Sequence, residues 1–595
     1  MSDLRAGDSF ISLGVKTRHS VLHPGDFHLT YPTDSLIGML TFSADGPEAE
    51  KQMRAVIFYM TTFGYIDGDF DDSERSYVRE YIHKLVAHRV RSAVSNDEAL
   101  SLELTQKYAA HFLEVFEEID RQVKDLFTEA VAEGEEQDDF VHAKLKLRCF
   151  EIFQSFDEGN QEQLIETVDE LINADGHVHP AEAKFRGELL DLLNQDMGIE
   201  LVDEVGKSNV NVAANQVLTT RPDDNPFFAQ FEKHYSSDPV ALKTQVESDR
   251  KLMDRVMAIL EQQRALGRGK LSGKQRVTEF APGSDFLDGH VYVTSPEPER
   301  EYELIVVGDL HGCYSCLKGV LTQTNFFQKV AAYERDPERS LCPKLVLLGD
   351  YIDRGMFSYQ GVLRSVLQLF SKLPDHVVML RGNHEYYIEH QGKVFGAVRP
   401  SEAMDSLKPH LSEEVFSHYV QLFEAMPSAY LFERFMFVHG GIPRDSTIKA
   451  QYKDLSSLNE WDIRFQMMWS DPSSADVIPA TLQEQSARFP FGKLQCQAFL
   501  QRMGCHTIFR GHEKVEAGFR RTYDSDAVSL FTVFSSGGAE NNDLPVDSSY
   551  RSVTPMAAVL RYKDGKGEVS PFLIDYKSFN EGSRNAFYQS AASLA

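Results

Sequence analysis

The first third of the chain has the hydrophobic periodicity of helices. From Met53 to about Leu193, apolar residues recur at intervals of three and four, which places them on one face of a helix. A clear example runs through Tyr108, Phe112, Val115, Phe116, Ile119, Val123, Leu126 and Phe127. Residues 1–50 have scattered Gly, Pro and Asp and little periodicity. The pattern predicts an all-α domain over residues 1–206.

This helical region contains a degenerate internal repeat. The stretches MTTFGYIDGDFDDSERSYVREYIHKL and VDELINADGHVHPAEAKFRGELLDLL align when Asp67 is placed on Asp175. Glu74 then falls on Glu182. Each copy predicts a helix, an Asp-Gly turn, and a second helix that is capped by Ser73 or by His179-Pro180 and begins with acidic residues.

The acidic turn DGDFDDSE has the composition of a calcium-binding loop, but its spacing excludes an EF-hand. Counted from Asp67, the sixth position is Asp72 rather than Gly, and the twelfth is Val78 rather than Glu. The region resembles the TerB-like (tellurite-resistance) helical domain, whose helix pairs carry an Asp-Gly turn followed by Glu. The resemblance implies an interaction module. A capped helical hairpin is the favoured interpretation of the turn; the alternative is a divalent-cation site at Asp67, Asp69, Asp71 and Glu74.

Residues 207–300 have the pattern of a linker that includes one amphipathic helix. TTRPDDNPFF is typical of a loop, and GRGKLSG and SPEPERE are typical of flexible connections. Between them, Val240 to Leu266 has the charged, amphipathic pattern of a single helix. A second domain is expected over residues 301–577.

Beyond Tyr302, five short apolar runs each end in a cluster of polar residues. The runs are LIVVGDLHG, KLVLLGDYIDRG, VVMLRGNHE, FMFVHGG and TIFRGHE. Such runs predict buried strands of a sheet covered on both faces, and a glycine before each cluster permits a sharp exit. Functional groups in α/β folds gather at one edge of the sheet. We therefore expect a site that contains Asp309, His311, Asp350, Asp353, Arg354, Asn383, His384, His439, Arg510 and His512.

These residue types favour a metal centre. Manganese, iron and zinc accept mixed imidazole and carboxylate ligands, and the lack of Cys in the set argues against a structural zinc site. One carboxylate can bridge two ions, and ion pairs about 3.5–4 Å apart are used for in-line displacement at phosphorus. Each motif alone is more often a turn or a core residue. All five together, each at a predicted strand end, indicate a site for two divalent ions.

Composition limits the other functions. A chain of 595 residues is too long for one core, so at least two domains are expected. A net charge of −29 argues against sequence-independent binding to nucleic acid or to an anionic membrane. Six Cys at irregular spacing do not form a disulfide framework, and the CxxC of Cys313 and Cys316 predicts two helix thiols. With no signal peptide and no long apolar run, the expected location is the cytoplasm.

Taken in order, GDLHG, GDYIDRG, RGNHE, HGG, WSDP and RGHE resemble the phosphoprotein phosphatase family of serine/threonine phosphatases, within the calcineurin-like metallophosphoesterases. The resemblance covers roughly residues 302–540. It implies an α/β fold, a metallophosphoesterase β-sandwich flanked by helices and preceded by the all-α domain. It also implies a phosphoprotein substrate and hydrolysis of phosphoserine and phosphothreonine by a hydroxide that bridges two metal ions, without a phosphoenzyme.

The same resemblance implies two sets of metal ligands. The first ion would be held by Asp309, His311 and Asp350. The second ion would be held by Asp350, Asn383, His439 and His512. Asp350 would bridge the two ions.

The resemblance also implies roles in catalysis. His384 would protonate the leaving alkoxide, a function worth about 10²–10⁴-fold in rate. Asp353 would orient it and keep the imidazolium protonated near neutral pH. Arg354 and Asn383 would bind the phosphate, and Glu385 would support the site without acting in catalysis.

Two departures from the family pattern affect substrate contacts. Relatives have a second phosphate-binding Arg between WSDP and an FxFG strand, and Arg488 is the only Arg between WSDP and FPFG here. We assign it that role. Many relatives place a Tyr over the site in SAPNY, whereas this chain has FSSGGAENN, Phe534 to Asn542, which predicts a smaller and more flexible loop.

Two other functions are compatible with parts of the sequence. A dinucleoside polyphosphate hydrolase of the diadenosine tetraphosphate type, or another small-phosphoester hydrolase, is similar at GDLHG and GNHE, although WSDP, FPFG and RGHE favour a protein substrate. A scaffold with an inactive phosphatase domain would be expected to lack one of the ligands, and none is missing. We hypothesise that the helical half binds a protein partner and targets or restrains catalysis.

Overall fold

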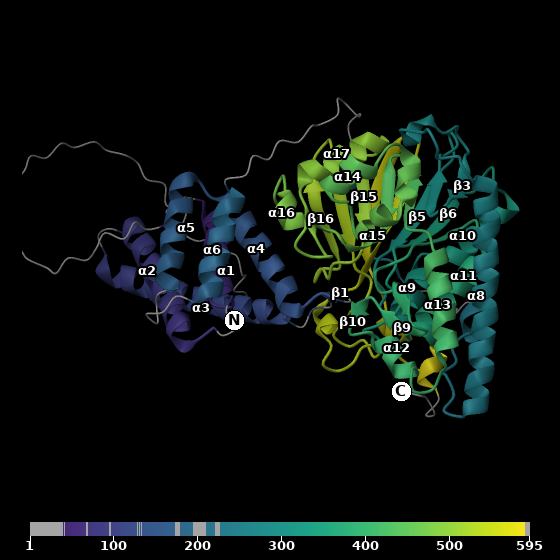
Figure 1. Ribbon diagram of the computed structural model, residues 1–595, viewed down its shortest axis with the longest axis horizontal. Coiled ribbons are helices and arrows are strands. Elements are labelled where there is room, and N and C mark those ends of the chain that lie inside the picture. The colour runs from purple at the N-terminus through teal and green to yellow at the C-terminus, as the bar shows by residue number, and fades with distance from the viewer. Residues whose placement is uncertain are drawn as a thin grey trace, which may run out of the picture. The chain divides into compact units, whose positions relative to one another are not determined.

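The computed structural model describes residues 40–589 with short gaps, and the chain divides into two compact units. The gaps are residues 41, 44, 67–69, 95–96, 128, 130, 133, 173–178, 194–209 and 220–225. The helical unit comprises residues up to 129 and 136–196. The second unit comprises residues 130–135 and 197–595 and is called the catalytic unit because it contains the predicted site. Each unit is described separately (Figure 1).

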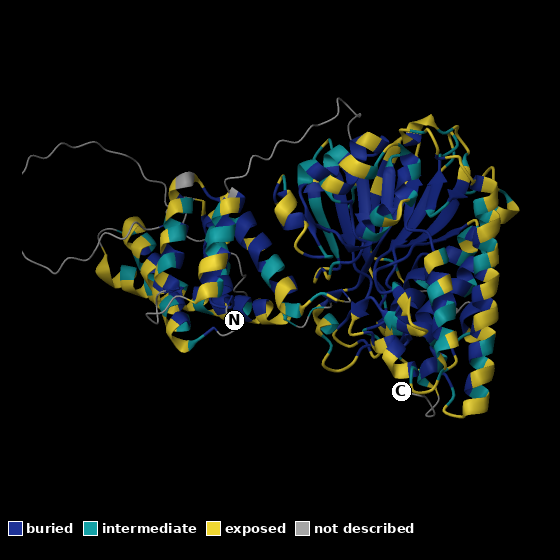
Figure 2. Ribbon diagram, viewed as in Figure 1, coloured by how far each residue is buried: buried dark blue, intermediate teal, exposed yellow. Residues whose placement is uncertain are grey.

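The described part of the helical unit is built from helices, as the periodicity predicts. They are α1 (Gly46–Phe63), α2 (Asp72–Ala93), α3 (Glu98–Leu126), α4 (Gln137–Ser155), α5 (Glu158–Leu171) and α6 (Pro180–Leu193). Helix α3 buries one apolar stripe, which includes Phe112, Phe116, Ile119 and Val123. Figure 2 shows the same alternation of buried and exposed faces along the other helices of the unit.

The internal repeat is visible at the starts of α2 and α6. Asp71 caps α2 in place of the predicted Ser73, which lies inside the helix. The Asp71 Oδ1 accepts from the Glu74 N–H at 2.8 Å, and the Glu74 side chain accepts from the Asp71 N–H at 3.0 Å. At the aligned position, the Glu182 side chain accepts from the His179 N–H at 2.9 Å. These bonds satisfy backbone donors that a helix start leaves free. They favour the capped-hairpin interpretation at this end of the turn, while residues 67–69 lie outside the described residues.

Removing the first of these caps should destabilise the helical unit. Asp71→Ala should lower its free energy of unfolding by about 0.5–2 kcal/mol, because a backbone N–H of α2 loses its acceptor. Hydrogen exchange of the amides in the first turns of α2 measures the change. The control is Asp72→Ala, which removes an exposed carboxylate one residue further on. Equal exchange in both variants would contradict the prediction.

The catalytic unit is a sandwich of two sheets. The six-stranded sheet has the order β2 (Val210–Val212), β19 (Lys566–Leu573), β18 (Met556–Lys563), β5 (Tyr302–Val307), β6 (Cys342–Leu347) and β7 (Val377–Met379). The seven-stranded sheet has the order β16 (Phe519–Asp524), β17 (Ser529–Val533), β15 (Thr507–Arg510), β12 (Phe435–Val438), β11 (Ala429–Phe432), β4 (Val291–Thr294) and β3 (Asp285–Asp288). Most strands of both sheets are buried (Figure 2).

The five apolar runs of the sequence form strands in both sheets. Three of them, β5, β6 and β7, pair in parallel in the six-stranded sheet. The other two, β12 and β15, pair in parallel in the seven-stranded sheet. The polar residues that end these strands therefore come from two sheets, where the sequence predicted one edge of a sheet.

Helices and short elements cover the two sheets. The main helices are α8 (Pro239–Gly267), α9 (Tyr314–Gln323), α10 (Phe326–Arg335), α11 (Arg364–Lys372), α13 (Glu413–Ala425), α14 (Asp445–Gln451), α15 (Trp461–Trp469) and α17 (Lys493–Met503). Shorter elements are α7 (Pro226–Ala229), α12 (Glu402–Leu407), α16 (Ala480–Gln483), β1 (Val131–Ala132), β8 (Tyr387–His390), β9 (Lys393–Gly396), β10 (Val398–Arg399), β13 (Asp471–Pro472) and β14 (Pro490–Phe491).

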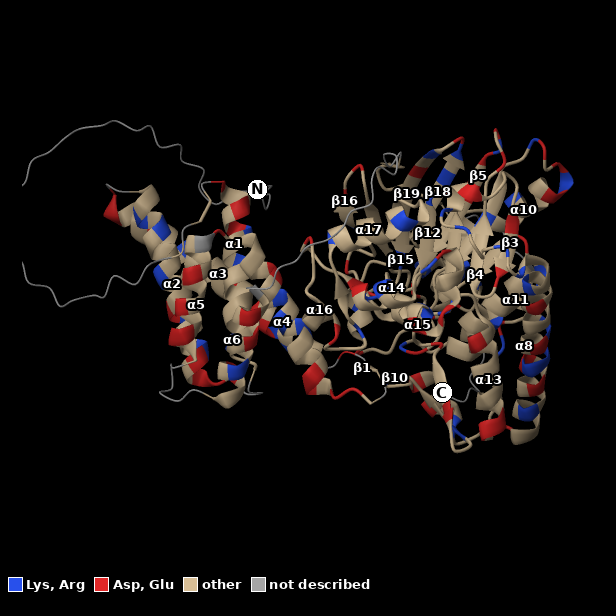
Figure 3. Cartoon of the chain, turned by 45° about the horizontal axis from the view of Figure 1, so that its top comes forward, with Lys and Arg blue, Asp and Glu red and all other residues tan. Residues whose placement is uncertain are grey.

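The predicted amphipathic helix is α8, and it packs into the catalytic unit. Arg364 of α11 donates two hydrogen bonds to the Asp249 carboxylate of α8, at 2.8 and 2.7 Å. Both side chains are largely buried, and the bidentate geometry fixes the two helices to each other. The stretch 207–300 also contributes β2, β3 and β4 to the sheets. The outer face of α8 carries many of its charged residues (Figure 3).

All six cysteines are buried and free, including Cys313 and Cys316 at the start of α9.

Among the described residues, no helix combines the length and the apolar character needed to cross a membrane.

Candidate metal centre

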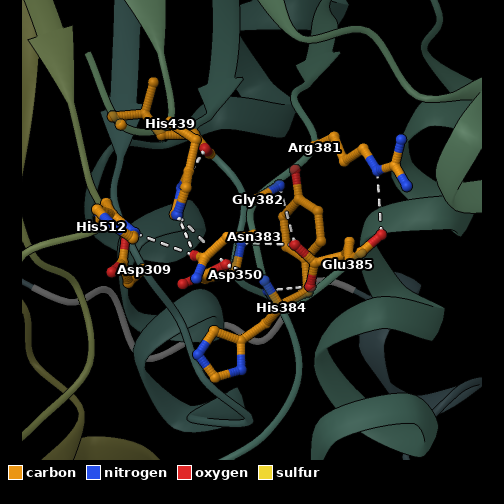
Figure 4. Close-up of polar contacts among 12 residues, drawn as sticks. Asp309, Asp350, Arg381, Gly382, Asn383, His384, Glu385, His439 and His512 are labelled. Carbon is orange, nitrogen blue, oxygen red and sulfur yellow. Dashed lines mark hydrogen bonds and ion pairs between the residues drawn. The ribbon is translucent and has the colours of Figure 1, made fainter. Parts of the chain in front are cut away.

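The polar ends of five strands converge at one buried site. Asp309 follows β5, Asp350 follows β6, and Asn383 follows β7. His439 follows β12 and His512 follows β15. A backbone bridge between Asp309 and Phe534 joins the ends of β5 and β17, and so connects the two sheets at this point. All six predicted ligands, including His311, are buried. Figure 4 shows Asp309, Asp350, Asn383, His439 and His512 lying together.

The two oxygens of Asp350 face two different groups of ligands. On one side, Oδ2 lies 3.5 Å from His311 Nε2, which is 3.8 Å from Asp309 Oδ2. On the other side, Oδ1 lies 3.4 Å from His439 Nε2. A single carboxylate between two ligand groups is the arrangement that bridges two cations.

Hydrogen bonds of the imidazole rings orient them toward the centre. His311 Nδ1 is 2.9 Å from the Ile352 carbonyl oxygen, and His439 Nδ1 is 3.0 Å from that of Leu348. Each Nδ1 therefore carries the proton and donates, which leaves the Nε2 lone pair facing the other ligands. This use of the second ring nitrogen is typical of metal-binding His.

Asn383 completes the second ligand group. Its Oδ1 lies 2.8 Å from His439 Nε2 and 3.1 Å from His512 Nδ1. In this orientation three acceptors face one another, an arrangement that a cation between them would stabilise. With the amide reversed, its nitrogen would instead donate to both rings and to Asp350 at 2.8–3.3 Å.

Burial and charge also fit a metal site. Asp309 Oδ2 and His512 Nε2 are buried and have no hydrogen-bond partner in the described part of the chain. Burial raises the pKa of Asp309 to about 7, and the Asp350 carboxylate acts in the same direction. Burial likewise raises the pKa of Asp350 to about 8. A divalent cation would supply the positive charge that these buried carboxylates need in order to ionise.

Glu385 connects the turns that carry the ligands. Its carboxylate accepts from the N–H groups of Asp350 and Tyr351 at 2.8 Å and from that of Gly382 at 3.1 Å. The turn after β6 and the turn after β7 are therefore held by one buried side chain. This matches the expectation that Glu385 supports the site.

The ligand turns adopt unusual backbone conformations. His311, Asp350 and His512 have φ values of 42°, 54° and 68°, in the left-handed region that non-glycine residues seldom occupy. Gly349 has φ of 109°, and a Cβ there would lie 2.4 Å from the Gly382 nitrogen. Such strain is typical of sites whose geometry is fixed by the surrounding structure.

His384 and Asp353 form the expected pair, and their surroundings have opposing effects on protonation of the ring. His384 Nδ1 is 2.6 Å from Asp353 Oδ2, and Asp353 Oδ1 accepts from the Ala403 N–H at 2.8 Å. Burial lowers the pKa of His384 well below its ordinary value, and the charges of Arg354 and His439 act in the same direction. Burial thus opposes the protonated ring that the sequence predicts, whereas the contact with Asp353 favours it.

The structure places both predicted phosphate-binding arginines near the ligands. Arg354 follows Asp353 directly, and its Nη1 pairs with Glu402 Oε1 at 2.5 Å. Arg488 Nε pairs with Asp471 Oδ2 at 2.7 Å, and its Nη2 reaches the His512 carbonyl at 3.5 Å. Glu402 was not identified from the sequence, because nothing in its surroundings distinguishes it from other surface acids.

Asp471 of the WSDP motif holds two arginines at the site. Its Oδ1 accepts from Arg510 Nη2 at 2.7 Å, while its other oxygen pairs with Arg488. Arg510 is fully buried and also donates to the Ser470 carbonyl. Asp471 therefore fixes the position of Arg488, and the buried Arg510 in turn fixes the Asp471 carboxylate.

The loop Phe534 to Asn542 is mostly buried, which differs from the flexible loop expected. The Ser535 hydroxyl accepts from the Gly308 N–H at 2.9 Å and so holds the loop to the end of β5. An aromatic side chain that the sequence did not reveal approaches the site from further along the chain. The Tyr550 ring lies 5.3 Å from that of His311. Burial raises the pKa of the Tyr550 hydroxyl, partly offset by Arg354, so it remains a hydrogen-bond donor.

Comparison with known proteins agrees with this geometry. Residues 302–516 match the family described as calcineurin-like phosphoesterase. The serine/threonine-protein phosphatase 4 catalytic subunit of Saccharomyces cerevisiae is 27% identical over 233 residues, which are 38% of this chain and 68% of the relative. A serine/threonine-protein phosphatase of Encephalitozoon cuniculi, named as probable, is 25% identical over 48% of this chain and 56% of its own length.

Among solved structures, a Saccharomyces cerevisiae protein serine/threonine phosphatase with similarity to human phosphatase PP5 is 18% identical. It covers 55% of this chain and 90% of its own, with a TM-score of 0.34. A TM-score this low has no bearing on the function.

The class of protein follows from the strand-end ligands and these matches. Residues 302–516 are a calcineurin-like phosphoesterase domain, and the chain is a phosphatase. Its named relatives are serine/threonine-protein phosphatases.

Metal affinity should depend on pH, because a bound cation must displace the protons of Asp309 and Asp350. With pKa values raised to about 7 and about 8, the apparent Kd of the metal-free protein for Mn²⁺ should weaken about tenfold from pH 8 to 7, and more steeply below. Isothermal titration calorimetry across this range measures it. An affinity independent of pH would contradict the prediction.

The raised pKa values of Asp309 and Asp350 also determine how the stability of the metal-free protein changes with pH. In the unfolded chain they titrate near pH 4, well below their folded values. The metal-free protein should therefore lose stability as the pH rises from about 4 to about 8, and bound metal should remove that loss.

Proposed function

We propose that this protein is a metal-dependent protein serine/threonine phosphatase that hydrolyses phosphomonoesters. The observation that carries the proposal is Asp350, whose two oxygens face His311 and His439 in separate ligand groups. The His384–Asp353 pair lies beside the first group. The serine/threonine-protein phosphatase relatives support a phosphoprotein substrate.

We assign two divalent ions, Mn, Fe or Zn, to the two ligand groups. When bound, such ions lower the pKa of water and neutralise charge that develops on the phosphoryl oxygens. Asp309, His311 and Asp350 would hold one of them. Asp350, Asn383, His439 and His512 would hold the other. Two groups with one shared carboxylate set the spacing between the ions.

His384 would give its proton to the leaving alkoxide. Asp353 holds the ring through Nδ1 at 2.6 Å, which leaves Nε2 as the atom that can reach the leaving oxygen. Burial, which lowers the pKa of His384, favours a neutral ring before substrate binds. A bound phosphate dianion would favour protonation, since it brings negative charge beside the ring.

Arg354 and Arg488 would bind the phosphoryl oxygens, together with the Asn383 amide. A guanidinium presents a planar fork of donors that fits phosphate geometry. Asp471 holds Arg488 by an ion pair, so this guanidinium is oriented before substrate arrives, whereas Arg354 is paired with Glu402. We also propose that the helical domain, residues 1–206, binds a protein partner that targets or restrains the domain at 301–577.

Replacement of the proposed acid should separate turnover from metal binding. His384→Ala should lower phosphopeptide turnover by about 10²-fold or more and leave the metal content unchanged, because a serine alkoxide leaves poorly without a proton donor. Steady-state kinetics and elemental metal analysis give the two readouts. The control is His390→Ala, which removes an exposed imidazole from the nearby strand β8. Loss of metal in His384→Ala would reassign the residue as a ligand.

The substrate class is tested by parallel assays. The metal-loaded enzyme should release phosphate from a phosphoserine or phosphothreonine peptide at least tenfold more efficiently, by kcat/KM, than it cleaves a dinucleoside polyphosphate. Asp350→Asn should abolish both activities and both bound ions, since it removes the shared carboxylate. A preference for the dinucleoside polyphosphate would show that the substrate is a nucleotide and would contradict the proposed protein substrate.

A further inference from the structure

A short stretch between two helices of the helical unit belongs to the catalytic unit. Residues 130–135 connect α3 and α4 in the sequence but group with the catalytic residues. Within them, β1 pairs antiparallel with β10: Val131 lies opposite Arg399, and Ala132 lies opposite Val398 (Figure 1). The two strands form a two-stranded sheet of their own.

The side chains of β1 are buried beside the metal centre. Val131 and Ala132 are each 9% exposed. Ala132 packs in an apolar cluster with Val398, Trp469 and their neighbours Ala397 and Met468. The Trp469 ring lies 6.1 Å from that of His512. Backbone pairing together with a small side chain in an apolar pocket is the usual way in which an extended peptide binds at a sheet edge.

The end of the same stretch carries a charge. Glu135 has one carboxylate oxygen that is buried and without a hydrogen-bond partner among the described residues. Its charge acts on Arg444: burial lowers the pKa of that guanidinium, and the carboxylates of Glu484 and Glu135 oppose the change. The surface therefore fits an extended segment with small apolar side chains followed by an acidic residue.

Strand β10 leads directly to the proposed phosphate-binding and acid residues. Glu402, three residues after the strand, pairs with Arg354 at 2.5 Å. The next residue, Ala403, donates its N–H to Asp353 at 2.8 Å. An element that fixes β10 therefore also fixes the turn from which Glu402 pairs with Arg354.

We propose that β1 and the nearby Glu135 form an intramolecular docking segment that restrains the enzyme. In the docked state, the segment pairs with β10 and holds the turn at 398–403, so that Glu402 forms an ion pair with the Arg354 guanidinium. When the segment is released, Glu402 moves away and the guanidinium can bind phosphate. The proposal rests on the phosphate-binding role given to Arg354 under the proposed function. A strand of two residues is a small interface, so a single substitution can shift the equilibrium between docked and released states.

Release of the segment is tested by Ala132→Asp, which places a charge in the apolar cluster. Hydrogen exchange of the amides at 396–403 should become at least about tenfold faster. The control is Ala258→Asp, the same substitution at an exposed position of α8, and it should leave exchange unchanged. The milder Ala132→Ser should give an intermediate effect if the aspartate variant does not fold. Unchanged exchange in a folded Ala132→Asp protein would overturn docking.

The effect on Arg354 is tested with inorganic phosphate as the probe. In the metal-loaded full chain, both Ala132→Asp and Glu402→Gln should bind phosphate several-fold more tightly by calorimetry, and their KM for a phosphopeptide should fall. The control is Asp405→Asn, which removes an exposed carboxylate from the same helix. Unchanged or weaker phosphate binding in Glu402→Gln would overturn the restraint.

Phosphate binding is measured without turnover. Tighter binding in an enzyme that does not hydrolyse phosphopeptides would therefore reject the proposed substrate and keep the docking segment.

Discussion

The two oxygens of one buried carboxylate, Asp350, face two separate groups of ligands. The catalytic unit must hold both groups in contact with this one side chain, and the rest of its structure depends on that requirement. A buried carboxylate without a compensating charge tends to keep its proton, and burial raises the pKa of both Asp309 and Asp350. The ligands around Asp350 are acceptors whose lone pairs face one another, as at Asn383 and His439. The two cations that we propose would satisfy both requirements, because they would favour ionised carboxylates and would lie between the acceptors.

The scaffold meets this constraint by bringing two sheets to one point. Parallel strands β5, β6 and β7 supply ligands from one sheet, and β12 and β15 supply them from the other. The turns after β6 and β7 are held by the Glu385 carboxylate through backbone N–H groups of both turns. Left-handed backbone at Asp350 and His512 then aims the side chains inward. This strain persists because the surrounding core is buried and closely packed.

The helical unit is built on a different principle. Its helices pack by apolar stripes and are capped at equivalent positions by Glu74 and Glu182, so each copy of the repeat is stabilised locally. Between α3 and α4, however, Val131 and Ala132 pair with β10 in the catalytic unit. Ala132 lies in the same apolar cluster as Trp469.

The sequence alone determined the helices of the first unit, the five strands and the polar residues that meet where these strands end. Helical and strand periodicities depend on near neighbours in the chain, and each ligand follows its own strand directly, as Asp309 and His439 do. Tertiary structure decided the division of the strands between two sheets, the approach of Tyr550 to His311, the pairing of Glu402 with Arg354 and the docking of β1. These are contacts between residues far apart in the chain. No local pattern encodes them, because they form only when the two sheets and their connecting turns pack together.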